Sequence, residues 1–172
     1  MGIDKLSDAS GFEKIKLLVM DCDGVLTDGR LFFTVSGETI KVFNVRDGQG
    51  LVMWHAAGGI SAIISGRDSG GIIEKRAEEL GIEHVRTNSM DKAADLRRIL
   101  TASGLKAEET AYMGDDVGDI AVLNIVGLPI AVADAAEEIL PHCSIVTNAA
   151  GGEGAVREVI DKLLAAKNKS NQ

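Results

Sequence analysis

The feature that most constrains the fold of this chain is its alternation of short apolar runs with stretches of helical periodicity. The apolar runs predict buried strands at 17–20, 60–64, 82–85, 110–113, 130–132 and 144–146. The periodic stretches predict helices at 51–57, 69–80, 91–103, 135–140 and 155–166, with a further short helix after Asp116. Strands that alternate with helices predict an α/β protein with a doubly wound, Rossmann-like parallel sheet.

One segment departs from this alternation. The runs 31–34 and 40–43 are rich in aromatic and β-branched residues, and they flank a short turn that contains Gly37. This pattern predicts a small β-hairpin inserted at about residues 30–45.

The whole length of 172 residues fits a single domain over residues 1–172, with a polar tail at 167–172.

The charge balance excludes one class of partner. The chain carries 18 Lys and Arg against 26 Asp and Glu, a formal net charge of −8, which disfavours binding to the phosphate backbone of a nucleic acid. No apolar run reaches the roughly 18 residues of a membrane-spanning helix, so no membrane partner is expected. The two cysteines, Cys22 and Cys143, are too few for a disulfide framework. With a polar leader at 1–16, they favour a cytoplasmic protein.

Polar residues gather where the predicted strands end, which is the edge at which parallel sheets bind ligands. Asp21 and Asp23 follow the first strand, and on an extended segment their side chains point to the same side. If Asp115, which follows a later strand, converges with them, the three carboxylates need a divalent cation. Their hard oxygen ligands favour Mg²⁺. Lys92, at the start of a predicted helix, offers a cation for a phosphate group.

Simpler or competing interpretations apply to some of these residues. A calcium loop beginning at Asp21 would need an oxygen ligand at Val25 and a glycine at Leu26, so that motif is excluded. No glycine-rich loop of the P-loop type occurs in the chain. Asp47 is also typical of a helix cap, and Arg76 is also typical of a solvated helix face.

Several ordered motifs resemble those of the haloacid dehalogenase-like phosphatases. They are DCDGVLTD at 21–28, Ser65, Lys92 and GDDVGD at 114–119. Five further segments resemble the small branch of that family without a cap domain, namely FNVRDGQG at 43–50, ISGRD at 64–68, ELGI at 79–82, GLPIAVADA at 127–135 and GGEGAVREV at 151–159. The resemblance covers the chain from about residue 16 to residue 164 and implies the haloacid dehalogenase fold.

The resemblance implies a two-step phosphatase mechanism. Asp21 would be the nucleophile that forms an aspartyl-phosphate, and Asp23 would be the general acid and then the general base. Lys92 would be a third catalytic residue, pairing with the phosphate and with Asp21. Mg²⁺ would be bound by the Asp21 carboxylate, the Asp23 backbone carbonyl and Asp115.

The resemblance assigns supporting roles to other residues of the same motifs. Ser65 would donate a hydrogen bond to a phosphate oxygen. Asp116 and Asp119 would hold Lys92 or metal-bound water.

Contacts to a phosphorylated acidic sugar are implied in the same way. A loop over the site and nearby cations would supply them, from Asn44, Val45, Arg46, Asp47, Gly48, Gly66, Arg67 and Arg76. The hairpins of this branch pack around a central axis, which implies a homotetramer. The glycine-rich segment before Ala155 would then reach the site of a neighbouring subunit.

The activity implied is hydrolysis of 3-deoxy-D-manno-octulosonate 8-phosphate, a step in making lipopolysaccharide precursors. Val52, Asp68 and Glu153 stand where relatives often carry basic or small polar residues, which leaves a nonulosonate 9-phosphate as an alternative substrate. A receiver-type phospho-switch without turnover is an alternative of a different class. Receivers place an adjacent acidic pair first, whereas here the DxD motif comes first and the adjacent pair late, so the order favours an enzyme.

Overall fold

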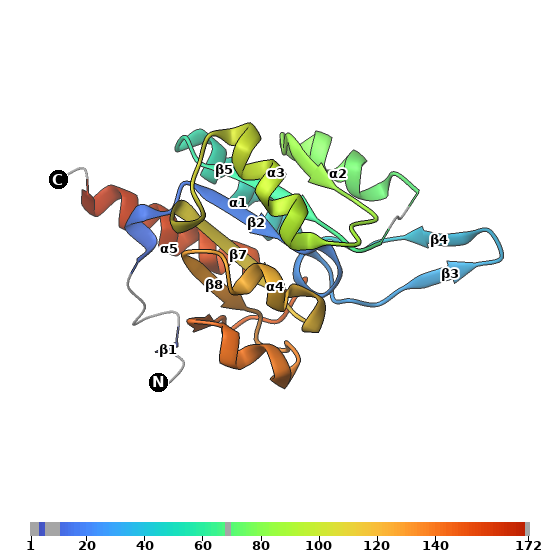
Figure 1. The fold of residues 1–172 in the computed structure, drawn as a ribbon. Coiled ribbons are helices and arrows are strands. Elements are labelled where there is room, and N and C mark those ends of the chain that lie inside the picture. Colours follow the sequence, from blue (N-terminus) through green and yellow to red (C-terminus); the bar gives the residue numbers. More distant parts are fainter. Residues whose placement is uncertain (1–3, 6–10, 68–69, 171–172) are drawn as a thin grey trace.

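The computed structural model describes residues 4–5, 11–67 and 70–170, and its centre is a seven-stranded sheet (Figure 1). The strands follow the order β1-β9-β8-β7-β2-β5-β6, and every neighbouring pair is parallel. Their bounds are β1 Asp4–Lys5, β2 Leu17–Met20, β5 Ile60–Ile64, β6 His84–Arg86, β7 Thr110–Gly114, β8 Leu128–Ala131 and β9 Ile145–Val146. The predicted doubly wound α/β sheet is confirmed.

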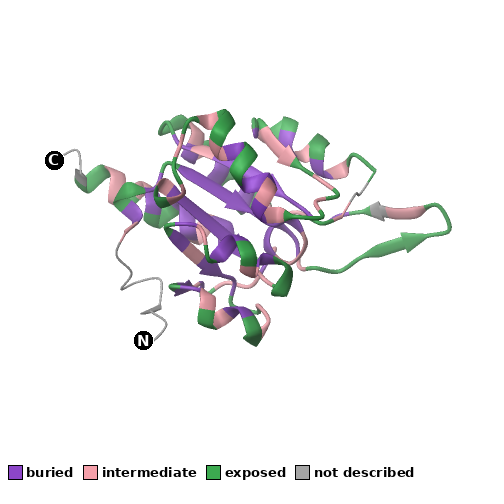
Figure 2. Ribbon diagram, viewed as in Figure 1, coloured by how far each residue is buried: buried purple, intermediate pink, exposed green. Residues whose placement is uncertain are grey.

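Helices cover both faces of the sheet, which gives the molecule two cores. The helices are α1 Val45–Ala56, α2 Ile72–Leu80, α3 Lys92–Ser103, α4 Ile120–Leu123 and α5 Ala155–Ser170. Leu18 and Met20 of β2 belong to the core formed with α1, α2 and α5, while Leu17 and Val19 belong to the core formed with α3 and α4. Because β2 is covered on both faces, all four of its residues are apolar and buried (Figure 2).

Several elements differ from the sequence-based expectation, including strand β1, which was not expected. Helix α1 begins at Val45 rather than at residue 51, because the Asn44 side chain caps it by accepting a 2.9 Å hydrogen bond from the Arg46 backbone N–H. The helix predicted at 135–140 is a 3-10 helix at Glu137–His142. Helix α5 continues to Ser170, through the first part of the predicted polar tail. In the described ranges, no helix has the length and apolar character needed to span a bilayer.

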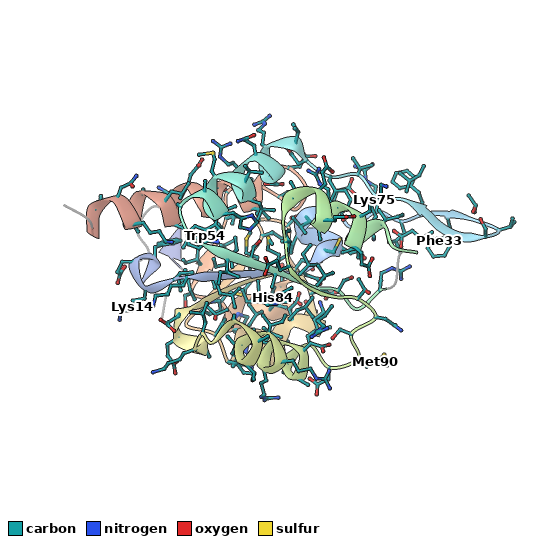
Figure 3. The ribbon with its side chains drawn as sticks, turned by 90° about the horizontal axis from the view of Figure 1, so that it is seen from above. Lys14, Phe33, Trp54, Lys75, His84 and Met90 are labelled. Carbon is teal, nitrogen blue, oxygen red and sulfur yellow. The ribbon has the colours of Figure 1, made fainter. Side chains whose placement is uncertain are left out.

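The predicted hairpin is present and projects away from the sheet (Figure 1). Of its antiparallel strands, β3 (Phe32–Thr34) begins one residue later than its predicted run, and β4 (Gly37–Ile40) lies three residues earlier than its predicted run, so that it starts in the predicted turn. Phe33 is 62% exposed on this hairpin (Figure 3). The hairpin therefore contributes apolar surface to the outside of this chain rather than to its core.

Candidate active site

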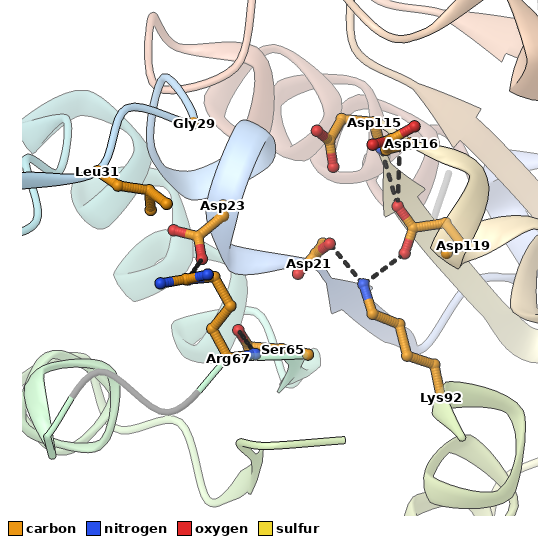
Figure 4. A pocket seen from close by; sticks show the side chains of 12 residues that line it. Asp21, Asp23, Gly29, Leu31, Ser65, Arg67, Lys92, Asp115, Asp116 and Asp119 are labelled. Atoms are coloured by element: carbon orange, nitrogen blue, oxygen red, sulfur yellow. Dashed lines mark hydrogen bonds and ion pairs between the residues drawn. The ribbon is translucent and has the colours of Figure 1, made fainter. Parts of the chain in front are cut away.

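The carboxyl end of β2 lies where the chain order of the sheet reverses. From β2 the chain runs outward through β5 and β6, and it then returns to the other side of β2 to form β7, β8 and β9. Doubly wound sheets bind their ligands at such a switch point. A cavity of about 380 Å³ lies there (Figure 4), lined by Asp21, Asp23, Gly29, Leu31, Ser65, Gly66, Arg67, Lys92, Asp115, Asp116, Gly118 and Asp119.

A wide helical turn at Cys22–Leu26 follows Asp21 at the end of β2. It is closed by a 3.1 Å hydrogen bond from the Thr27 backbone N–H to the first carbonyl of the turn, and Gly24 has a φ of +86°. The sequence predicted an extended segment that would aim Asp21 and Asp23 to one side. The segment is a turn rather than a strand, but both carboxylates line the one cavity, as expected, and each has a different partner there (Figure 4).

Asp21 and Lys92 form the centre of a network of charged hydrogen bonds. Asp21 Oδ1 accepts from the Cys22 backbone N–H (2.6 Å), and Asp21 Oδ2 accepts from Lys92 Nζ (2.5 Å). Lys92 Nζ also donates to Asp119 Oδ1 (2.8 Å), which accepts from the buried hydroxyl of Tyr112 as well (2.6 Å). The ammonium of Lys92 is thereby held beside Asp21 in the cavity.

The electrostatics of this network favour an added cation. Burial, offset in part by Lys92, raises the pKa of Asp21 to about 6. Burial and the charges of Asp21 and Asp119 raise the pKa of Asp115 to about 8. Burial by itself would lower the pKa of Lys92, but the two carboxylates beside it outweigh burial and raise that pKa. Negative charge is therefore in excess, and a divalent cation would relieve it.

The carboxylates have the donor atoms of a site for a hard divalent cation. Asp21, Asp115 and Asp119 each offer an oxygen, and these oxygens lie within 4.8 Å of one another. Asp119 already accepts hydrogen bonds from Lys92 and from the Asp115 backbone, whereas the Asp115 carboxylate makes no hydrogen bond within the described residues. The expected approach of Asp115 to Asp21 is seen, and Asp119 joins them, whereas the ligand expected from Asp23 is a backbone carbonyl and stays a prediction.

Asp23 is held by residues that the sequence did not indicate. Its Oδ1 accepts a hydrogen bond from Lys41 Nζ, which also forms a 2.8 Å ion pair with Glu38. Burial would lower the pKa of Lys41, but the bonds to these two carboxylates raise it. The segment around Lys41 was interpreted only as a hairpin strand. Strand periodicity carries no signal for a contact with an acid 18 residues earlier in the chain.

The residues after β5 line the cavity opposite Asp115 and Lys92, as expected from their strand end (Figure 4). Ser65 Oγ accepts a 3.2 Å hydrogen bond from the Arg67 backbone N–H, which leaves the hydroxyl hydrogen for an acceptor in the cavity. The Arg67 guanidinium lies 5.7 Å from the centre of the Phe33 ring. The sequence predicted Gly66 and Asp116 among the lining residues, but it did not indicate Gly29, Leu31 and Gly118.

Comparison with known proteins now decides the family. A family model described as haloacid dehalogenase-like hydrolase matches residues 70–160. The chain is 42% identical over 160 residues to the 3-deoxy-D-manno-octulosonate 8-phosphate phosphatase of Escherichia coli K12, which covers 93% of this chain and 85% of that protein. The chain belongs to the haloacid dehalogenase-like hydrolase family.

Solved structures support the same assignment. The cobalt-bound deoxy-D-mannose-octulosonate 8-phosphate phosphatase of Haemophilus influenzae matches this hydrolase with a TM-score of 0.90 and 40% identity, over 94% of each chain. The 3-deoxy-D-manno-octulosonate 8-phosphate phosphatase of Moraxella catarrhalis, in complex with a magnesium ion, a phosphate ion and KDO, matches with a TM-score of 0.87 and 38% identity, over 94% of this chain and 92% of that chain.

Six residues of this hydrolase that the family resemblance placed near the substrate do not line the cavity. They are Asn44, Val45, Arg46, Asp47, Gly48 and Arg76. The expected loop at 44–48 is instead the capped start of α1, and Gly48 is buried within it. Arg76 lies against this helix, pairs with Glu79 (2.8 Å) and stacks 5.6 Å from the Phe43 ring. The side chains of Asn44, Asp47 and Arg76 thus have partners within this chain, whereas Val45 is 78% exposed.

Asp47 has the clearest structural role of the six. Its carboxylate is buried at the start of α5, where Oδ1 accepts a 2.8 Å hydrogen bond from the Arg157 backbone N–H. Burial raises the pKa of Asp47, while hydrogen bonds from backbone N–H groups around Arg157 act in the opposite direction. Asp47 does not cap its own helix, which begins at Val45, and instead its carboxylate caps the start of α5.

The glycine-rich segment before α5 packs against the Cys22–Leu26 turn of its own chain. The Gly152 backbone N–H donates to Val25 O (2.9 Å), and a Cβ atom at Gly151 would lie 1.8 Å from Gly24 O. The two glycines support the turn that follows Asp21, and side chains there would displace it. The expectation that this segment also reaches a neighbouring subunit stays a prediction.

Proposed function

We propose that this hydrolase is a Mg²⁺-dependent phosphatase that converts 3-deoxy-D-manno-octulosonate 8-phosphate into 3-deoxy-D-manno-octulosonate and phosphate. The observation that carries the proposal is the Asp21–Lys92–Asp119 network in a cavity that Asp23, Ser65 and Arg67 also line. Relatives named for this activity match nearly the whole chain, and the Moraxella catarrhalis structure contains a magnesium ion, a phosphate ion and KDO. The reaction would place this enzyme in the formation of lipopolysaccharide precursors.

Asp21 is proposed as the nucleophile. One carboxylate oxygen attacks the phosphorus in line with the ester oxygen of the sugar, so that a bond from Asp21 to phosphorus forms as the phosphorus–sugar oxygen bond breaks. Lys92 keeps the Asp21 carboxylate in place and lies close enough to attract the phosphoryl oxygens. Ser65 donates its hydroxyl hydrogen to one of these oxygens, from a buried position at the end of β5.

Asp23 is proposed as the acid and base of the two steps. It gives a proton to the departing sugar oxygen, which leaves as an alcohol. It then takes a proton from the water that attacks the aspartyl-phosphate, so that phosphate is released and the Asp21 carboxylate is restored. Asp23 lines the same cavity as Asp21 but is bonded to Lys41 rather than to Lys92, which separates its role from that of the nucleophile.

The metal would be held by the carboxylates of Asp21 and Asp115 together with the backbone carbonyl of Asp23. Bound there, Mg²⁺ supplies positive charge that offsets the charge of the transferring phosphoryl group. Asp119 keeps Lys92 and the Asp115 backbone in place through its hydrogen bonds. Asp116 lines the cavity beside Asp115, where its carboxylate can hold water around the ion.

An acidic sugar suits the charges at the cavity mouth. Arg67 lines the cavity with its side chain 40% exposed, so it can meet a substrate carboxylate. Two positions that raised the nonulosonate alternative, Val52 and Glu153, do not line the cavity, and Asp68 lies outside the described residues. We therefore favour the octulosonate ester.

Measured phosphate release tests this function. The purified protein is assayed with Mg²⁺ on octulosonate 8-phosphate, a nonulosonate 9-phosphate and a hexose 6-phosphate, with Asp21→Asn as control. We expect kcat/KM for the octulosonate ester to exceed that for the hexose ester by at least about tenfold, which corresponds to roughly 1.4 kcal/mol of discrimination in the transition state. Preference for the nonulosonate would replace the proposed substrate. Release that stops at one phosphate per chain would instead indicate a phospho-switch.

We also propose that the enzyme works as a homotetramer in the cytoplasm. The hairpin exposes Phe32, Phe33, Val35 and Ile40, an apolar surface that association with other copies would bury. Cys22 and Cys143 are both free and buried, which suits a reducing compartment.

A further inference from the structure

We propose that Lys41 is the positioning residue for Asp23, holding one oxygen of its carboxylate so that the other is presented to the leaving group of the substrate. This inference rests on the acid–base role of Asp23 in the proposed function. Lys41 itself does not line the cavity, so it acts through Asp23 rather than on the substrate.

The contacts of Lys41 fix its ammonium from both sides. The residue directly follows β4, and its side chain is only 1% exposed. Its Nζ donates to Asp23 Oδ1 and lies 2.8 Å from Glu38 Oε1, whose side chain is only 3% exposed. A buried ammonium between two carboxylates has little freedom to move, because any departure would leave a buried charge without its partner.

The two oxygens of Asp23 are consequently different. Oδ1 is bonded to Lys41, whereas Oδ2 makes no hydrogen bond to any residue that the structure describes and lies 3.8 Å from Arg67 Nε, beyond hydrogen-bonding distance. Oδ2 is therefore the oxygen that remains to exchange a proton with the sugar oxygen. Without Lys41, the carboxylate could rotate so that neither oxygen is held in this position.

The place of Lys41 in the fold explains why a hairpin precedes α1. Glu38 lies within β4 opposite Phe33 of β3, and Lys41 follows β4 directly, so the same hairpin both holds Asp23 and presents apolar surface. Arg67 also spans the two parts, since it faces Glu38 (3.6 Å) and stacks on Phe33. The hairpin thereby contributes a wall to the acid–base side of the cavity.

The dependence of the rate on the leaving group separates positioning from a general structural role. An alkoxide such as the sugar oxygen needs a proton as it departs, whereas nitrophenolate leaves readily without one. We would measure kcat/KM of wild type and Lys41→Met on octulosonate 8-phosphate and on p-nitrophenyl phosphate, because kcat/KM reports the steps up to formation of the aspartyl-phosphate. β-Glycerophosphate provides a second ester with an alkoxide leaving group.

We expect Lys41→Met to lower kcat/KM on both alkyl esters by about 30-fold or more, part of the roughly 10²–10⁴-fold that a general acid contributes. On p-nitrophenyl phosphate the loss should stay within about threefold. Lys16→Met is the matched control, since it removes an ion pair to Glu109 outside the cavity. It should leave kcat/KM unchanged on both the alkyl esters and p-nitrophenyl phosphate. An equal loss on alkyl and aryl esters would overturn the positioning role.

A double-mutant cycle gives a second criterion. In an Asp23→Asn background, adding Lys41→Met should cause little further loss on the sugar ester, because Lys41 acts through Asp23. Independent, multiplying losses would contradict the proposal. If Lys41→Met is too unstable to assay, Glu38→Gln loosens the same ammonium and should show the same leaving-group dependence to a smaller degree.

The crystal structure of Lys41→Met adds a readout that does not depend on turnover. We expect the Asp23 carboxylate to adopt a different or mixed orientation there, and an unchanged single orientation would overturn the inference. The same assays distinguish a wrong substrate from a wrong role for Lys41. If the substrate is wrong, the wild-type enzyme cleaves the aryl ester and β-glycerophosphate but not the octulosonate ester.

Discussion

Gly24 lies directly against the carboxylate of Asp115, so closely that a Cβ atom at position 24 would stand 2.0 Å from Asp115 Oδ2. The two residues come from different strand ends, the turn after β2 and the end of β7. Their approach brings the Cys22–Leu26 turn against Asp115, which follows the neighbouring strand β7. Gly24 also has a φ of +86°, a conformation that other residues rarely adopt.

Gly24→Ala should therefore displace Asp115 as well as strain the backbone. Strain at a positive φ costs about 1–2 kcal/mol, and the clash adds to that cost. We expect a lower unfolding temperature and a Mg²⁺ affinity at least about tenfold weaker, measured by calorimetry. Gly58→Ala is the matched control, because Gly58 has a φ of +76° with nothing within 4 Å of its Cβ position. Equal effects of the two substitutions on Mg²⁺ affinity would contradict this account.

The pH dependence of stability should reveal the raised pKa of Asp115 in protein freed of metal. A carboxyl whose pKa is raised from 3.8 to about 8 binds more protons in the folded chain than in the unfolded chain. Its contribution to the free energy of unfolding therefore falls as pH rises from about 4 to 8. We expect the difference in unfolding temperature, wild type minus Asp115→Asn, to become more negative over this range.

Added Mg²⁺ should reverse that trend, since the ion binds the ionised carboxylate. The increase in unfolding temperature on adding Mg²⁺ should be larger at pH 8 than at pH 5, and it should be small in Asp115→Asn. Thermal unfolding in buffers with and without a chelator measures both effects. If the difference in unfolding temperature between metal-free wild type and metal-free Asp115→Asn does not change with pH, Asp115 is not buried among charges as described.

Asp47 offers a test that separates a helix cap from a substrate contact. Because its carboxylate accepts a hydrogen bond from the Arg157 backbone N–H, Asp47→Ala should lower the free energy of unfolding by about 1–2 kcal/mol. Folded Asp47→Ala should keep kcat/KM within about threefold of wild type, since Asp47 does not line the cavity. Denaturant unfolding and the phosphate assay measure the two quantities. A large rise in KM with unchanged stability would restore the role in substrate binding.

The hairpin should control assembly. Phe33→Asp places a charge on an exposed apolar surface that the proposed tetramer buries, so we expect smaller particles by light scattering. Met90 is 93% exposed and lies away from the hairpin (Figure 3), so Met90→Asp is a suitable control. A monomeric wild type would contradict the proposed tetramer. Dissociation by Met90→Asp but not by Phe33→Asp would show that the interface does not lie at the hairpin.

The sequence by itself determined the sheet and the strand ends that carry the chemistry. Apolar runs alternating with helical patterns require a parallel sheet, and such a sheet brings the residues after β2, β5 and β7 to one edge. The positions of Asp21, Ser65 and Asp115 around one cavity follow from that periodicity. The order of the motifs along the chain identified the family, because these motifs lie at the ends of strands and helices, which the sheet brings together.

Only the tertiary structure decided which side chains meet within the site. Lys41, directly after a hairpin strand, bonds to Asp23, in the turn after a strand of the sheet, and no periodicity encodes that contact. Asp47 caps a helix 110 residues later in the chain, a contact that depends on how α1 and α5 pack. Periodic patterns specify which face of an element is buried. Contacts between distant loops depend instead on the shape of the folded chain, which no local pattern specifies.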